Sequence, residues 1–175
     1  MEHILTEPYT KEKTANFRAG DTVLISGTIY TARDAAHEKL QAMIENGEKL
    51  PFEIEDAILY YVGPTPAREG YLIGSAGPMT SCRMDRYTPL LLEKGLLATM
   101  GKGPRGEKVI ETGRKTGAVY LAAIGGAAAL IAQCVESAEV VAFEELGTEA
   151  VRKLKVRNFP AVVAIDRFGN NIYNT

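Results

Sequence analysis

The first half of the chain alternates between strand-like and helix-like patterns of apolar positions. Segments rich in β-branched and aromatic residues predict strands over residues 21–31, 57–63 and 71–77. Gly27 lies inside the first of these segments, where we expect a bend. Between the first two strands, apolar residues recur at helical spacing and predict a helix over 31–48 that is capped by Thr31 and ends at Gly47. Residues 63–70 are typical of a turn.

The second half continues the alternation. Strands are predicted over 96–103, 118–126 and 138–146, and helices over 107–117 and 127–137. A helix that ends at Gly95 is also predicted, with two alternative starts. It is either capped at Thr80 or Ser81 and kinked at Pro89, or it begins afresh at Thr88. Residues 159–174 predict a hairpin that turns at RFGN. We therefore expect an α/β fold, a single layered domain with a mixed sheet over residues 1–175, in which residues 1–20 form a lead-in segment.

Composition narrows the class of protein. The 175 residues are 46% apolar and 24% charged, as in an ordinary globular domain, and a net charge of −2 gives no basic footprint for nucleic acid. Residues 118–135 are uncharged and nearly long enough to span a bilayer, but Gly125, Gly126 and Gln133 favour a buried strand, a turn and a buried helix. We expect a cytoplasmic protein that binds neither membrane nor nucleic acid.

The most informative loop is GSAGPMTSCRMD, residues 74–85. A strand that ends in this loop exposes backbone N–H groups, and Thr80 and Ser81 add hydroxyls. Arg83 adds the two-pronged donor that suits a carboxylate or phosphate. The alternative is a capped helix in which Arg83 pairs with Asp85 or with solvent.

Two further cations lie at turns. Arg33 and His37 are four residues apart at the start of a predicted helix, so they share one helix face. Lys102 lies in GKGPRG, which resembles a dinucleotide loop but lacks the acidic residue expected about 20 positions later. Because loops of alternating α/β folds gather at one sheet edge, Arg33, Arg83 and Lys102 predict a positive pocket for a small dianion.

Four motifs now carry a family resemblance: GTIYTARDAAH, GPMTSCRMD, MGKG and IDRFGNN. In this order the sequence resembles the β subunit, equivalent to the C-terminal domain, of iron–sulfur-dependent class I fumarases and L-tartrate dehydratases. The resemblance implies a swivelling β/β/α domain and reversible hydration of a small dicarboxylate, fumarate or malate before tartrate. It also implies a [4Fe-4S] cluster held by three cysteines of a partner α subunit, so no metal site is expected on this chain.

The resemblance implies a role for each candidate residue. Arg33, Arg83 and Lys102 would bind the substrate carboxylates, and His37 would act as an acid/base or orienting group. The family usually has two threonines after Gly-Pro, whereas this chain has Met79 followed by Thr80. Thr80 is therefore the candidate catalytic hydroxyl. A non-catalytic dicarboxylate-binding or scaffold relative is the alternative, and the isolated chain is a candidate homodimer.

Overall fold

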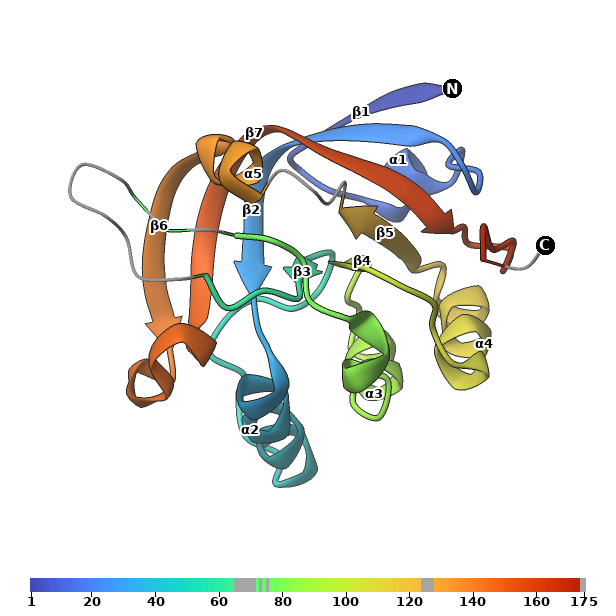
Figure 1. Cartoon of the computed structure of the whole chain (residues 1–175). Helices are drawn as coiled ribbons and strands as arrows, with labels where there is room; N and C mark the ends of the chain where they lie inside the picture. The colour runs from blue at the N-terminus through green and yellow to red at the C-terminus, as the bar shows by residue number, and fades with distance from the viewer. Residues whose placement is uncertain (65–71, 73, 75, 124–127, 174–175) are drawn as a thin grey trace.

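A seven-stranded mixed sheet forms the centre of the protein. The computed structural model describes residues 1–64, 72, 74, 76–123 and 128–173, with main chain only for 128–130. The sheet order is β1-β2-β3-β4-β5-β7-β6. Its strands are β1 (Glu2–Thr6), β2 (Thr22–Thr31), β3 (Ile58–Tyr60), β4 (Ala98–Gly101), β5 (Val119–Ala123), β6 (Val135–Ala142) and β7 (Val151–Ile165). The first five run parallel to one another, and β7 runs antiparallel to its neighbours, which confirms the expected mixed α/β sheet (Figure 1).

The sheet closes on itself because β2 pairs with β7 as well as with β1 and β3. The pairing register of β2 with β7 shifts between Ile25 and Gly27, and Gly27 has a φ of +140°, which confirms the expected bend. Side chains from the closed strands form one core; fully buried members include Ile29, Ile58, Met100, Leu121 and Val163. Burial of these apolar side chains is the main force that holds the ring of strands together.

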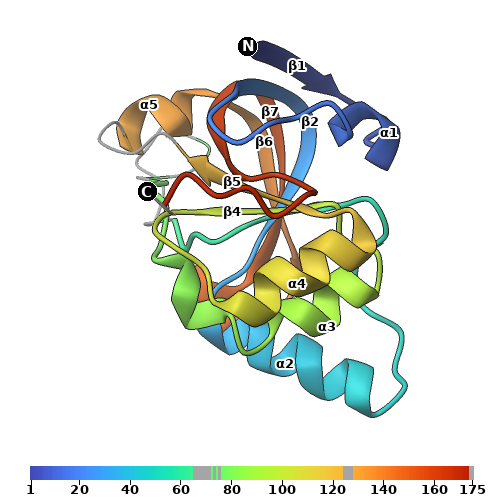
Figure 2. The same ribbon diagram turned by 90° about the vertical axis from the view of Figure 1, so that its right-hand side faces the viewer.

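Three helices cover one side of this sheet. They are α2 (Asp34–Glu45), α3 (Thr88–Glu93) and α4 (Glu107–Thr116), and Figure 2 shows them stacked together. Their apolar residues, among them Leu40, Leu91 and Val109, form a second core together with Tyr61, which directly follows β3. The remaining elements are α1 (Lys11–Thr14), α5 (Ala128–Gln133) and the 3₁₀ turns η1 (Ser81–Met84) and η2 (Glu144–Glu149).

The start of α2 differs from the expectation. The predicted Thr31 cap is wrong, because Thr31 is the last residue of β2 and its hydroxyl accepts a hydrogen bond from the Arg152 backbone N–H at 3.3 Å. Arg33 is the N-cap residue and makes no side-chain capping bond. The predicted end is confirmed, since Gly47 follows the helix with a φ of +70°.

The end of the GPMTSCRMD loop and the segment after it combine both predicted starts. Residues 81–84 form the short turn η1, and α3 then begins at Thr88 with Pro89 in its first turn. A proline is tolerated there because its missing N–H has no partner within the helix. Gly95, with a φ of +106°, ends the helix as expected.

The two ends of the chain contain more regular structure than the pattern indicated. Residues 1–20, expected as a lead-in segment, contain β1 and α1, and β1 pairs with β2 along its whole length. The hairpin predicted over residues 159–174 is confirmed at its turn, after which Asn171 bridges antiparallel to Ile165 and the Ile172 N–H donates to the Ala164 carbonyl oxygen at 2.9 Å. Its first strand is longer than predicted, because β7 already begins at Val151. The helix predicted over 127–137 ends at Gln133, because β6 begins at Val135.

Part of the sequence interpretation lies outside the described residues. This holds for most of the turn over 63–70 and for the glycine turn at 125–126. A strand was also predicted over residues 71–77. Residues 72, 74, 76 and 77 do not form a strand, and residues 71, 73 and 75 lie outside the described part of the chain. The strand and the helix predicted around that glycine turn are confirmed as β5 and α5. No helix in the described part of the chain has the length and apolar character needed to cross a membrane.

Candidate functional site

Two of the three candidate cations follow the carboxyl ends of parallel strands. Arg33 comes two residues after β2, and Lys102 comes directly after β4. Strand β3 lies between them and runs parallel to both. The carboxyl ends of parallel strands lie at one edge of a sheet, where α/β proteins bind ligands. Arg33 and Lys102 therefore share this edge.

The GPMTSCRMD loop reaches the same edge and pairs with β4. Thr80 and Lys102 form an isolated parallel bridge, in which the Ser81 N–H donates to the Lys102 carbonyl at 2.9 Å and the Lys102 N–H donates to the Met79 carbonyl at 3.1 Å. A Cβ on Gly101 would collide with Ser81 Oγ and lie 3.0 Å from the Met79 carbonyl oxygen. Glycine is therefore required for this close approach. It leaves Thr80 and Lys102 side by side and exposed.

Arg83 connects the loop to the start of α2. Its guanidinium lies 2.6 Å from Asp34 Oδ2, and both side chains are well exposed. The alternative prediction, that Arg83 pairs with Asp85, is wrong, because the Asp85 carboxylate binds Arg105 instead. Asp34 directly follows Arg33, so the ion pair places Arg83 beside the Arg33 position on α2. An exposed pair of this kind is weak and can be exchanged for a ligand carboxylate.

Arg33 is held by close packing. A Cβ on Gly63 would lie 2.5 Å from Arg33 Cδ and 2.9 Å from the Thr148 carbonyl oxygen. Within the described residues, Arg33 Nε is buried without a hydrogen-bond partner. Such atoms are rare, because an unpaired buried donor loses its bonds to water without replacing them. The helical turn that follows Arg33 is also anchored, because the Ala35 N–H donates a hydrogen bond to Glu149 Oε1 at 3.2 Å.

His37 is fully buried beneath this edge. Its Nδ1 lies 2.7 Å from the Arg33 carbonyl oxygen, which only accepts, so Nδ1 carries the proton. The ring packs against the rings of Tyr61 and Tyr87, with centroids 5.4 and 5.8 Å away. Burial lowers the pKa of His37 from its ordinary value to about 4. His37 is thus neutral at pH 7 and bonded to the Arg33 main chain.

We expect this burial to make the protein sensitive to acid. The pKa of His37 is about 6.5 in the unfolded chain and about 4 in the folded one, so between these pH values the unfolded chain binds the extra proton. Stability is fully present above pH 6.5 and falls toward pH 4, by roughly 3 kcal/mol at most. Urea unfolding from pH 7 to pH 4 measures this loss. A His37→Gln variant should lose most of this slope, whereas His3→Asn retains His37 and should keep it. An unchanged slope in His37→Gln contradicts the assignment.

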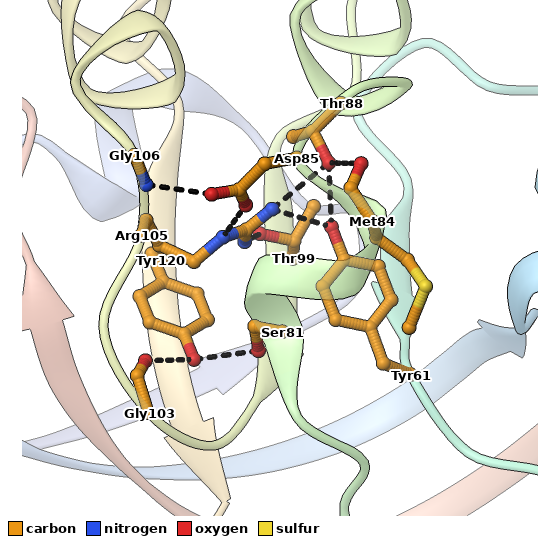
Figure 3. Close-up of polar contacts among 10 residues, drawn as sticks. All are labelled: Tyr61, Ser81, Met84, Asp85, Thr88, Thr99, Gly103, Arg105, Gly106 and Tyr120. Carbon is orange, nitrogen blue, oxygen red and sulfur yellow. Dashed lines mark hydrogen bonds and ion pairs between the residues drawn. The ribbon is translucent and has the colours of Figure 1, made fainter.

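A buried polar network under the loops was missed by the sequence analysis (Figure 3). Arg105, 6% exposed, donates from Nε to Asp85 Oδ1 at 2.6 Å. Its other nitrogens donate to hydroxyls 2.9–3.1 Å away, those of Thr99, Thr88 and Tyr61. Burial by itself lowers the pKa of Arg105, but nearby Tyr61 and Asp85 raise it, and the net shift is upward. The sequence did contain a signal for this pair. Asp85 lies in the GSAGPMTSCRMD loop and Arg105 in GKGPRG, and both loops were predicted to lie at the same sheet edge.

The described residues hold no group of three or more His, Cys, Asp or Glu side chains that could bind a metal ion. Cys82 is exposed in η1, and Cys134 precedes β6 with its thiol 3.8 Å from the Asn158 carbonyl oxygen. The chain has only these two cysteines. This donor set does not fit a cluster held by three cysteines.

Comparison with known proteins places the chain in a family. Residues 2–175 match the family model described as Fumarase C-terminus. A Methanocaldococcus jannaschii protein assigned as an L(+)-tartrate dehydratase subunit beta is 41% identical over 170 residues, which cover 94% of this chain and 87% of that protein. Fumarate hydratase 2 of Leishmania major is 40% identical over 94% of this chain and 29% of its own length. The aerobic class I fumarate hydratase of Escherichia coli K12 is 43% identical over 85% of this chain and 28% of its length.

The chain thus spans under a third of the fumarate hydratases that it matches, and most of the M. jannaschii subunit. The family match covers nearly every residue, including the four motifs and the edge that holds Arg33, Arg83 and Lys102. On this match, the chain belongs to the fumarase C-terminal family, together with class I fumarate hydratases and tartrate dehydratase β subunits.

Proposed function

We propose that this chain is the β subunit of a two-subunit hydro-lyase that reversibly hydrates and dehydrates a small dicarboxylate. Fumarate and malate are the preferred candidates for the substrate pair, and tartrate is the second candidate substrate. The main support is the length of the matches: the chain aligns with 87% of a protein named as a β subunit and with 28–29% of the larger fumarate hydratases. A β subunit requires an α partner. We expect the complex in the cytoplasm, and the isolated chain as a candidate homodimer.

The chain's own part in this reaction is to bind and orient the substrate. Arg33, Arg83 and Lys102 supply three positive charges at one sheet edge, two of them as planar guanidinium groups that suit carboxylates. A bound carboxylate would give the buried Arg33 Nε the acceptor that it lacks among the described residues. Fixing both ends of a dicarboxylate removes much of the entropic part of the barrier.

Thr80 and His37 have separate roles in this proposal. Thr80 is exposed beside Lys102, whose charge would favour the alkoxide form of a nearby hydroxyl. His37 is buried and bonded to the Arg33 carbonyl oxygen, so we assign it the orienting role rather than proton transfer with substrate. Met79, at the usual threonine position, packs partly buried against the helix-side core.

The [4Fe-4S] cluster of this proposal would belong to the α subunit, since the residues of this chain do not fit it. We therefore derive no chemical step through a cluster on this chain. The functional unit is the complex, in which the edge that holds Arg33 and Lys102 would face the partner.

Anaerobic co-expression with a candidate α subunit that carries three cysteines tests the proposal. We expect the purified pair to interconvert fumarate and L-malate, followed by fumarate absorbance, and the chain alone to show no turnover. Turnover by the chain alone after treatment with a metal chelator would contradict the proposal. The same assay with L-tartrate separates the two substrates.

The replacement of threonine by Met79 favours one other candidate, a dicarboxylate-binding relative without activity, because a thioether cannot accept a proton from carbon. Isothermal titration of the pair with L-malate distinguishes the two. Binding without turnover supports the binding protein, and turnover supports the enzyme.

A further inference from the structure

The Arg105 network joins the two loops that carry the candidate site. Arg105 lies three residues after Lys102 in the β4–α4 loop, and Asp85 follows η1, which carries Arg83. One Asp85 oxygen accepts from Arg105 Nε at 2.6 Å, and the other accepts from the Gly106 N–H at 2.6 Å. Figure 3 shows this carboxylate between the Arg105 side chain and the Gly106 main chain. The loops are therefore joined at their far end by a partly buried, charge-assisted contact.

A second contact joins the same loops nearer the site. The Tyr120 hydroxyl lies 2.6 Å from Ser81 Oγ and 2.8 Å from the Gly103 carbonyl oxygen. The Arg105 guanidinium lies over the Tyr120 ring, 4.8 Å from its centroid. Burial raises the pKa of Tyr120, so its phenol stays protonated and able to donate. Arg105 thus supports the tyrosine that holds Ser81 against Gly103.

Arg105 has the geometry that this junction requires. Its three nitrogens make four hydrogen bonds, one to a carboxylate and three to hydroxyls on β4, on α3 and on Tyr61, which directly follows β3. A lysine ammonium makes at most three bonds from a single point and cannot match this planar spread. The side chain of Arg105 is fully buried and its charge is paired with Asp85, so it does not compete for an anion at the surface.

We infer that Arg105 is a positioning residue for the dicarboxylate site, holding Thr80 and Arg83 in register with Lys102 without touching the substrate. This inference rests on the proposed function for its kinetic consequence, but the loop register can be measured without any activity. In a site that binds both ends of a small molecule, a displacement of about 1 Å costs on the order of 100-fold in rate.

The first test uses the isolated chain and the variant Arg105→Lys. Amide hydrogen exchange should accelerate at least 10-fold at Ser81 and Lys102, whose N–H groups bond across the two loops, and should change little within β7. Arg86→Lys is the matched control, because Arg86 is exposed, adjoins Asp85 and lies over Tyr87. Wild-type exchange at both amides in a folded Arg105→Lys chain would overturn the inference. So would equal acceleration throughout β7, which would show a general loss of stability.

The second test uses the assembled pair. Arg105→Lys should raise KM for L-malate about 10-fold or more, with affinity for the α subunit within twofold of wild type, while Arg86→Lys keeps both. Unchanged KM in the folded variant would overturn the inference even if exchange accelerates. Failure of the proposed function looks different: the wild-type pair would then show no turnover, and L-malate titration of both variants would replace the kinetic measurement.

Discussion

Replacing Arg83 with methionine should lower kcat/KM for L-malate by roughly 30- to 5,000-fold in the assembled pair. In a closed site, removing one partner of a hydrogen-bonded charge pair costs about 2–5 kcal/mol, and each 1.36 kcal/mol is about tenfold in rate. Folding should be almost unaffected, because the Arg83–Asp34 pair is exposed, with side chains 47% and 37% accessible. Exposed pairs contribute about 0–1 kcal/mol to stability.

Lys39→Met provides the matched control for Arg83. Lys39 lies on α2, the helix whose Asp34 pairs with Arg83. Like Arg83 it forms an exposed ion pair, with Glu145 at 2.8 Å, and its side chain is 44% exposed. It lies away from the edge that holds the candidate cations, so its loss should leave kcat/KM within twofold of wild type. Steady-state kinetics with fumarate and L-malate, together with urea unfolding of each variant, give both quantities. Equal activity losses in the two variants would contradict a specific role for Arg83.

The position of the candidate site was predictable because it depends on strand order alone. Arg33 and Lys102 follow strands that the apolar pattern identified, and parallel neighbours necessarily end at one edge. The spacing of Arg33 and His37, four residues apart on one helix, could be read from the sequence, but the contact between them could not. Arg33 is the N-cap residue, so His37 bonds to its carbonyl oxygen and is buried rather than lying beside the guanidinium.

The closure of the sheet was not predictable from the chain. Residues 151–158 (VRKLKVRN) carry four positive charges and read as polar, yet they form the first half of β7. The alternation of buried and charged positions is imperfect here, because Val151 and Leu154 are separated by two cations rather than one. Pairing of β7 with β2 is a long-range contact that local pattern cannot show.

Arg105 shows the same limit for a single side chain. Between Pro104 and Gly106 it resembles a solvated loop residue, and arginine is rarely buried. Its burial depends on Asp85, Tyr61, Thr88 and Thr99, which come from distant parts of the sequence. The requirement for a partner to each buried donor becomes visible only once those elements pack together.

Removing Asp85 should be the most destabilising change at this site. Asp85→Ala leaves the Arg105 guanidinium, whose side chain is 0% exposed, without its counter-charge, and it also removes the acceptor of the Gly106 N–H. Breaking a buried pair in this way costs about 3–5 kcal/mol, a large part of the stability of an ordinary domain. Urea unfolding followed by circular dichroism measures the loss, with Asp34→Ala, from the exposed pair, as the control.

The double variant Arg105→Met, Asp85→Leu separates the cost of an unpaired charge from the worth of the pair itself. If the loss in Asp85→Ala comes from leaving Arg105 charged and unpaired, removing both charges should recover about half of it or more. The Thr88 and Tyr61 hydroxyls keep a bond to each other, so they are not both left unsatisfied. A double variant as unstable as Asp85→Ala would instead show that the pair itself stabilises the fold. Recovery of stability without recovery of the KM for L-malate would place the function of Arg105 in holding the loops, since an apolar pair can fill the same space but cannot fix Ser81 and Lys102 in register.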